Sequence, residues 1–349
     1  MMDKNQAREI LMKPAWLSEP YWRVEALKLA DEEFLPRIRE ILLDPDEGYQ
    51  VHLAAAKALL RLGDSEFVEE IAYRSEPCHP STRVAAVRAL GERYAPTSEV
   101  VQRTLRDIWE EGNMWSQERD ELKVYYLDAL SSSFPAIVQG DDSIVDTLLA
   151  LVNFQHEHPR VLERVVELLL QARGRGAVPV FARAFEEVRD THYLARIYIR
   201  AIGEAGDPSY FEVIASYPEY VRKTAPHAYS DTLAAVIGVA GRLGMYEWLK
   251  EAGKRDLYFG THTAWLRALG EVARRQPQHR EEIVAILRRY IKPRDSTRSY
   301  KINWGVVPDR YAGHPPGAKV GEPEDDSVVL HNTAIEVLQS LGEEVEVQP

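Results

Sequence analysis

Hydrophobic residues recur at three- and four-residue spacing along almost the whole chain. Typical stretches are "EEFLPRIREILL" at 32–43, "DSIVDTLLALVNF" at 142–154 and "HREEIVAILRRYI" at 279–291. This spacing places apolar side chains on one face of an α-helix. Sustained alternation of apolar and polar residues, which would indicate strands, is nearly absent. The pattern therefore predicts an all-α protein.

A second kind of helix, rich in small residues, alternates with the first. Examples are "VHLAAAKALLRLGD" at 51–64, "TRVAAVRALGERYA" at 82–95 and "THTAWLRALGEVAR" at 261–274. Each carries an aliphatic residue near its end, which we call its anchor residue. The nine anchor residues are Ala30, Leu59, Leu90, Leu130, Leu169, Ile202, Ile237, Leu269 and Leu338. Consecutive anchors are 29, 31, 40, 39, 33, 35, 32 and 69 residues apart, and all but the last interval suit a repeat of two helices.

Turn residues support the same division of the chain. The dipeptide "GD" at 63–64 and the tripeptide "GDP" at 206–208 put Gly where a helix C-cap needs positive φ, followed by Asp as an N-cap. The complete pattern predicts nine helix pairs. Their ranges are 3–12/20–30, 32–43/50–62, 65–74/82–93, 98–111/121–132, 142–154/159–172, 177–189/191–205, 208–217/226–243, 245–252/260–274 and 277–290/327–341.

The repeated stretches resemble the HEAT-repeat family, including its phycobilin-lyase-like subgroup. The resemblance rests on "LLDPDEGYQVHLAAAKALL" and "STRVAAVRALG", and in part on "WRVEALKLAD", whereas 159–172 and 226–243 depart from the motif. It implies a right-handed α-solenoid of about nine HEAT-like helix pairs forming one domain over residues 1–349. Because the motif consists of packing residues, the resemblance carries little information about function.

The long final interval indicates an insertion in the last helix pair. Residues 292–326 are rich in Pro and Gly and show no helical period, so we expect a loop between the two helices. Three aromatic residues in it, Tyr300, Trp304 and Tyr311, are unusual for a solvated segment. They predict that the first part of the loop packs onto the solenoid and that the rest is more mobile.

Charged residues recur two positions before the anchor residues. In HEAT-like solenoids the second helix of each pair lines the concave surface, so this position is expected to face a partner. We call the resulting set the charged ribbon. It comprises Lys28, Lys57, Arg88, Asp128, Glu167, Arg200 and Arg267. Two interpretations stay open: an ordinary solvated face, or a charge-graded groove for a partner peptide or an anionic ligand.

The net charge is −12, yet residues 253–301 contain twelve Lys or Arg against five Asp or Glu. This basic segment could bind phosphate or an acidic partner, or it could be neutralised by "EPEDD" at 322–326. Its candidate residues are Arg274, Arg275, Arg288, Arg289, Lys292, Arg294, Arg298 and Lys301. Nucleic acid stays an alternative partner, although the acidic net charge disfavours it.

Signals of catalysis are weak. The chain contains no HExxH, Walker, GxSxG or CxxC motif. Its single cysteine, Cys78, excludes a Cys-based zinc cluster, and "HEH" at 156–158 lacks the further ligands that a di-iron HEAT-like hydroxylase would need. We therefore expect no metal and no cofactor.

These observations favour a non-enzymatic, cytoplasmic HEAT-repeat scaffold that binds a protein or peptide partner, with no membrane involvement. The chain has no apolar run long enough for a membrane span. The alternative is an enzyme or enzyme subunit on the same solenoid. It would be similar either to the chromophore lyases or to a nucleic-acid enzyme such as an alkylpurine DNA glycosylase.

Overall fold

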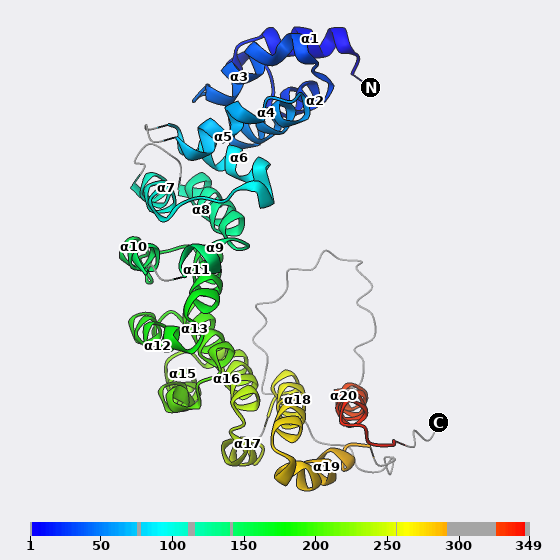
Figure 1. The fold of residues 1–349 in the computed structure, drawn as a ribbon. Helices are drawn as coiled ribbons and strands as arrows, with labels where there is room; N and C mark the ends of the chain where they lie inside the picture. Colours follow the sequence, from blue (N-terminus) through cyan, green and yellow to red (C-terminus); the bar gives the residue numbers. More distant parts are fainter. Residues whose placement is uncertain are drawn as a thin grey trace. The chain divides into compact units, whose positions relative to one another are not determined.

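The computed structural model describes residues 2–74, 78–110, 116–139, 142–255, 257–291 and 326–345. These residues form α-helices joined by short turns and 3₁₀-helices, and none of them lies in a strand (Figure 1). The predicted all-α class is therefore confirmed. None of the described helices is both long enough and apolar enough to cross a membrane.

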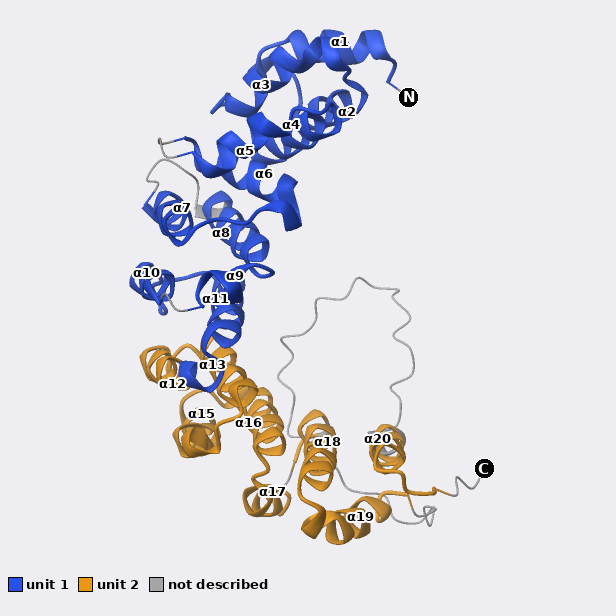
Figure 2. Cartoon of the chain, viewed as in Figure 1, with its two compact units in different colours: residues 1–177 blue, residues 178–349 orange. Residues whose placement is uncertain are grey.

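The chain divides into two compact units, residues 1–177 and 178–349 (Figure 2). In unit 1, first and second helices of successive pairs alternate. The first helices are α1 (Lys4–Met12), α3 (Leu35–Leu43), α5 (Ser65–Tyr73), α7 (Ser98–Glu110) and α10 (Ser143–Leu151). The second helices are α2 (Pro20–Leu29), α4 (Tyr49–Arg61), α6 (Pro80–Leu90), α8 (Ser116–Leu130) and α11 (Pro159–Arg173).

Unit 2 contains the same alternation. Its first helices are α12 (Val178–Glu187), α14 (Phe211–Ala215) with α15 (Tyr217–Thr224), α17 (Tyr246–Ala252) and α19 (Arg280–Arg288). The second helices are α13 (His192–Ala205), α16 (Tyr229–Leu243), α18 (Phe259–Arg275) and α20 (Asp326–Ser340). Each predicted helical range thus overlaps at least one observed helix.

Second helices pack against one another in chain order within each unit. In unit 1, α2 contacts α4, α4 contacts α6, α6 contacts α8 and α8 contacts α11. In unit 2, α13 contacts α16, α16 contacts α18 and α18 contacts α20. All nine anchor residues are buried, as their alignment predicts. The core of each unit is therefore built by side chains at equivalent positions of successive helices.

Local sequence explains where the helices start and stop. Asp3 and Gln6 form a capping box at α1, and Pro occupies the first position of α2, α6 and α11. Gly206 ends α13 with a φ of 74°, in the left-handed conformation that the "GDP" turn predicts. The predicted N-cap Asp64 makes no capping hydrogen bond. It binds the Arg39 guanidinium instead, with an Nε–Oδ2 distance of 2.7 Å.

Two short helices were not predicted. Helix α9 (Phe134–Ile137) follows α8, and the predicted single helix over 208–217 is replaced by a 3₁₀ turn, α14 and α15. Proline explains both differences, because Pro135 and Pro218 stand at helix starts, where their fixed φ is favourable. The predicted loop 292–326, with Tyr300, Trp304 and Tyr311, lies outside the described residues except for residue 326.

Candidate binding surface

The charged ribbon projects from the second helices as its position predicts. Six of its seven members are exposed and Asp128 is half-buried, whereas the anchor residues two positions later are buried. Five members belong to unit 1 (Lys28, Lys57, Arg88, Asp128 and Glu167) and two to unit 2 (Arg200 and Arg267). The ribbon is thus a solvent-facing row within each unit.

The three basic members of the ribbon in unit 1 differ in how strongly neighbouring residues hold their side chains. Lys28 on α2 is paired with Glu25 one turn away, with an Nζ–Oε1 distance of 2.6 Å. Lys57 on α4 has no ionic or hydrogen-bonding partner among the described residues, so its charge faces solvent. Arg88 on α6 is exposed but is fixed by two aromatic residues. Helices α2, α4 and α6 pack against one another in this order, and each carries one of these three cations.

Tyr49 and Tyr125 hold the side chain of Arg88. The Arg88 guanidinium lies 4.3 Å from the centroid of the Tyr125 ring and donates a hydrogen bond of 3.2 Å to the Tyr49 hydroxyl. The two tyrosine rings stack with centroids 4.7 Å apart. Burial raises the pKa of Tyr49, with Arg88 acting in the opposite direction, so the phenol stays neutral at physiological pH. This cluster orients Arg88 while leaving it exposed to a ligand.

The acidic members of the ribbon share one arginine that the sequence analysis did not single out. Arg164 on α11 binds Asp128 of α8 at 2.7 Å and Glu167 of its own helix at 2.5 Å. Arg164 stands five residues before its anchor, one turn from the ribbon position. The expected acidic stretch is therefore partly compensated, because one guanidinium offsets one of the two carboxylate charges.

Unit 2 offers a weaker version of the ribbon. Arg200 on α13 is exposed and makes no ion pair with any residue that the structure describes. Arg267 on α18 faces Glu336 on α20 at 3.9 Å, and both side chains are about two-thirds exposed. Such an exposed pair contributes little to stability.

Four buried basic residues in unit 1 were missed. Each stands seven residues before its anchor: Arg23, His52, Arg83 and Lys123. Because a charged residue in a helix is normally exposed, composition alone does not reveal them. Their constant distance from the anchor is the signal that could have identified them.

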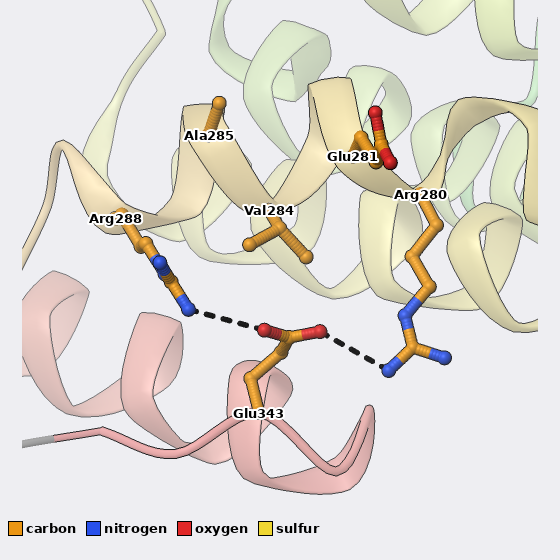
Figure 3. Close-up of a pocket in the computed structure, with 6 residues that line it drawn as sticks. All are labelled: Arg280, Glu281, Val284, Ala285, Arg288 and Glu343. Carbon is orange, nitrogen blue, oxygen red and sulfur yellow. Dashed lines mark hydrogen bonds and ion pairs between the residues drawn. The ribbon is translucent and has the colours of Figure 1, made fainter.

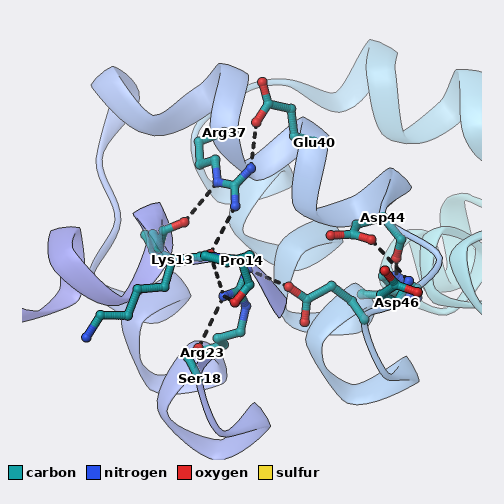
Figure 4. Close-up of polar contacts among 11 residues, drawn as sticks. Lys13, Pro14, Ser18, Arg23, Arg37, Glu40, Asp44 and Asp46 are labelled. Carbon is teal, nitrogen blue, oxygen red and sulfur yellow. Dashed lines mark hydrogen bonds and ion pairs between the residues drawn. The ribbon is translucent and has the colours of Figure 1, made fainter. Parts of the chain in front are cut away.

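Arg23 and Lys123 form equivalent buried ion pairs. Arg23 binds Glu47 at 2.5 Å, and Lys123 binds Glu157 at 2.6 Å. Each glutamate stands twelve residues before the anchor of the next second helix. The Arg23 guanidinium also donates to the Lys13 carbonyl at 2.9 Å and to the Ser18 hydroxyl at 3.2 Å (Figure 4). Burial raises the pKa of Glu47, and Arg23 opposes this shift.

The other two basic residues use different partners. His52 joins the Asp44 carbonyl at 2.8 Å to the Ser81 hydroxyl at 2.9 Å, and burial lowers its pKa to about 4. The Arg83 guanidinium contacts Asp107 of α7 at 2.8 Å and the Cys78 sulfur at 3.4 Å. Each link connects a second helix to another helix or to its adjoining turn.

The "HEH" tripeptide has a structural role. Glu157 accepts from the Lys123 ammonium and, at 3.2 Å, from the Trp109 indole N–H, while His158 caps the start of α11 by accepting from the Arg160 backbone N–H. No three His, Cys, Asp or Glu side chains converge as metal ligands in the described part of the chain. Glu157 is thus engaged in an ion pair.

The basic segment is partly neutralised by the C-terminal residues, as Figure 3 shows. Glu343 binds Arg280 and Arg288 of α19, both at 3.1 Å, beside a shallow pocket of about 470 Å³. Arg274 donates to the Ser340 hydroxyl, and Arg275 donates to the Arg242 carbonyl. Arg289 is exposed. The four other predicted members, Lys292, Arg294, Arg298 and Lys301, lie outside the described residues.

Known proteins offer no analogy for this surface. No family model, no curated protein and no solved structure matches the chain.

A small polar cluster links α18, the end of α19 and α20. The Tyr290 hydroxyl and the His262 Nε2 are 2.6 Å apart, and the His331 Nδ1 lies 3.2 Å from the Tyr290 carbonyl oxygen. Burial lowers the pKa of His262. The contact between Tyr290 and His331 links the end of α19 to α20, on either side of the predicted loop.

Proposed function

We propose that this chain is a HEAT-like, right-handed α-solenoid that acts as a scaffold and binds an acidic segment of a protein partner. The binding surface is the basic end of the charged ribbon, where Lys57 and Arg88 make the contact and Lys28 is already paired with Glu25. In support, second helices pack in chain order within each unit, and their anchor residues are all buried. Long surfaces of this kind are what solenoids use for recognition.

One observation carries the proposal: Arg88 is exposed yet held by Tyr49 and Tyr125. An arginine that is already ordered loses less side-chain entropy when it binds a carboxylate or phosphate. The adjacent Lys57 lacks a compensating charge among the described residues and adds a second cation. The acidic members Asp128 and Glu167 oppose an anionic ligand less than two free carboxylates would, because Arg164 offsets one of their two charges.

The test is fluorescence anisotropy of a labelled twelve-residue polyglutamate peptide with the full chain at low salt. We expect the double variant Lys57→Glu/Arg88→Glu to weaken binding at least tenfold. The matched control Arg183→Glu reverses one exposed charge in unit 2 and should leave binding within twofold. Tyr125→Leu should weaken binding about threefold without changing the charge, because Arg88 loses its aromatic support.

Two outcomes would count against the acidic-peptide surface. Wild-type protein that fails to bind the peptide at low salt contradicts it, and so does a double variant that binds as well as the wild type. A labelled single-stranded DNA of equal length serves as the competing ligand. Tighter DNA binding with a steep salt dependence would favour the alternative of a nucleic-acid-acting protein.

A further inference from the structure

Exposed apolar side chains are concentrated at one end of unit 1. Nine large apolar residues are exposed among those the structure describes, and seven of them lie between residues 12 and 43. The seven are Met12, Trp16, Leu17, Tyr21, Trp22, Leu29 and Leu43. A terminal helix pair of a stacked repeat normally carries a polar outer face. This concentration of exposed apolar side chains therefore indicates an interaction surface.

Two of these residues, Trp22 and Leu29, occupy positions that other second helices bury. Trp22 stands eight residues before its anchor and is 46% exposed, and Leu29 stands one residue before it and is 39% exposed. In every other second helix both positions are buried or half-buried. Fully buried examples are Val51, Leu122, Val161 and Leu194 at the first position, and Ala58, Leu168, Ala201 and Val236 at the second.

Close contacts in unit 2 show which neighbour covers this face. A Cβ on Gly241 of α16 would lie 2.7 Å from the Cα of Ala268, and one on Gly270 of α18 would lie 2.5 Å from a methyl group of Val337. Ala268 and Val337 both stand one residue before their anchors. The position one residue before the anchor therefore lies on the face of each second helix that packs against the preceding second helix. No described helix covers the equivalent face of α2, where Trp22 and Leu29 are exposed.

We propose that the open face of α2 is covered by α2 of a second copy of this chain, so that two copies pair end to end about a two-fold axis. Trp22 and Leu29 are seven residues apart, or two helical turns, and lie on one side of the helix. If the axis passes between residues 25 and 26, antiparallel helices set Trp22 of one copy against Leu29 of the other, twice. This is the self-complementarity that a closed dimer requires.

The charges on this face of α2 favour a second copy of the same chain as the partner. Glu25 lies between Trp22 and Leu29 on the same side of α2 and is already paired with Lys28 at 2.6 Å. Two copies would bring two neutral pairs to the axis. A partner of a single charge sign would gain nothing comparable from this balanced face.

The available area is adequate for a weak dimer. Trp16, Tyr21 and Trp22 are 80%, 63% and 46% exposed, and the Tyr21 and Trp22 rings contact each other edge to face at 5.0 Å. Since an aromatic side chain presents about 150–250 Å², the three leave roughly 300–450 Å² uncovered on each copy. Two copies would therefore bury roughly 600–900 Å² of aromatic surface, which is in the range of small, weakly associating interfaces.

Sedimentation velocity of the full chain between 1 and 200 µM, at physiological salt, tests the proposal. We expect a reversible dimer whose dissociation constant rises at least tenfold in Trp22→Lys and in Leu29→Glu. Tyr193→Glu, an equally exposed aromatic position on α13, is the control and should dimerise like the wild type. Circular dichroism checks that each variant stays folded.

A mixture of Trp22→Lys and Leu29→Glu supplies the decisive measurement. In the antiparallel arrangement the introduced charges of opposite sign face each other, so the mixture should associate at least fivefold more tightly than either variant alone. A wild-type chain that stays monomeric at 200 µM overturns the proposal, as does dimerisation that neither substitution weakens. A mixture that associates no better than its components overturns the antiparallel pairing.

Discussion

The two units join their second helices in different ways. In unit 1, four buried basic residues seven positions before the anchors reach across to carboxylates, hydroxyls and carbonyls. In unit 2, two of these positions hold Ala195 and Ser230, and the other two hold His262 and His331, which both contact Tyr290. The helices of unit 2 also approach closely at glycines. Gly203 faces Val239, Gly241 faces Ala268 and Gly270 faces Val337.

This difference shows that one arrangement of helices can be maintained by two kinds of contact with different weaknesses. A buried ion pair stabilises only while both partners are present, because a lone buried charge is strongly unfavourable. A close helix contact depends on the absence of a side chain and tolerates no added atom unless a neighbour moves. Substitutions at these contacts should therefore destabilise the two units for different physical reasons.

The largest effect is expected from Glu47→Ala. The substitution leaves the Arg23 guanidinium buried without its counter-charge, so unit 1 should lose about 3–5 kcal/mol of unfolding free energy. Urea titration with hydrogen exchange of peptides from α2 and α4 measures the loss. The control is Glu33→Ala, which breaks the exposed Arg8–Glu33 pair and should cost less than about 0.5 kcal/mol.

A double variant sharpens the same comparison. Arg23→Met combined with Glu47→Leu removes both buried charges and should recover much of the stability lost in Glu47→Ala. If Glu47→Ala costs no more than Glu33→Ala, the buried pair is not what joins α2 to the next helix.

The second prediction concerns pH. Burial holds the pKa of His52 at about 4, below its ordinary value of 6.5. Between these two pH values His52 is protonated in the unfolded chain and neutral in the folded chain. Stability should therefore fall as pH decreases from 6.5 toward 4, by up to about 3 kcal/mol. His52→Asn should remove this slope, and comparing the two proteins cancels the opposite contribution of Glu47. Parallel pH profiles for both would contradict the assignment.

The third prediction tests the glycine contacts of unit 2. In Gly241→Ala the new methyl group would lie 2.7 Å from the Cα of Ala268 and 2.9 Å from its carbonyl oxygen, so the backbone must move. We expect a loss of about 2 kcal/mol, measured by urea denaturation. Gly238→Ala is the matched control on the same helix. Its new methyl group meets nothing within 4 Å, so the better helix propensity should stabilise by about 0.5–1 kcal/mol.

The smallest effect should come from an ionic contact of unit 2. Arg267 and Glu336 are 3.9 Å apart and about two-thirds exposed, so Glu336→Ala should change the unfolding free energy by less than about 0.5 kcal/mol. A larger loss in the same urea experiment would show that unit 2 also depends on charge.

Sequence periodicity was sufficient to predict where the helices lie and which face of each is buried. Anchor residues such as Leu59 and Ile237 are fully buried because the same spacing that reveals a helix also defines its packing face. Short elements escaped this method. Helix α9 has only four residues, which is too few to show a period, and α15 begins at a proline-containing turn that interrupts one.

The surface was predicted less completely than the core. Position relative to the anchor was enough to predict that Lys57 and Arg88 are exposed. It could not show that Tyr49 and Tyr125 hold Arg88, because these residues belong to three different helices. The ion pair of Lys123 with Glu157 was missed for the same reason, since partners that lie 34 residues apart meet only through packing of successive pairs.

The contact between Tyr290 and His331 also bears on how this chain can change in length. Because the two residues meet in space, the end of α19 lies against the first half of α20, so the two ends of the connection are held close together in unit 2. Between two ends held in this way, doubling the length of any flexible insert costs only about 0.6 kcal/mol of closure entropy. The site is therefore a permissive junction, where evolution or an experimenter can splice in a reporter or a whole domain without rebuilding the helices on either side.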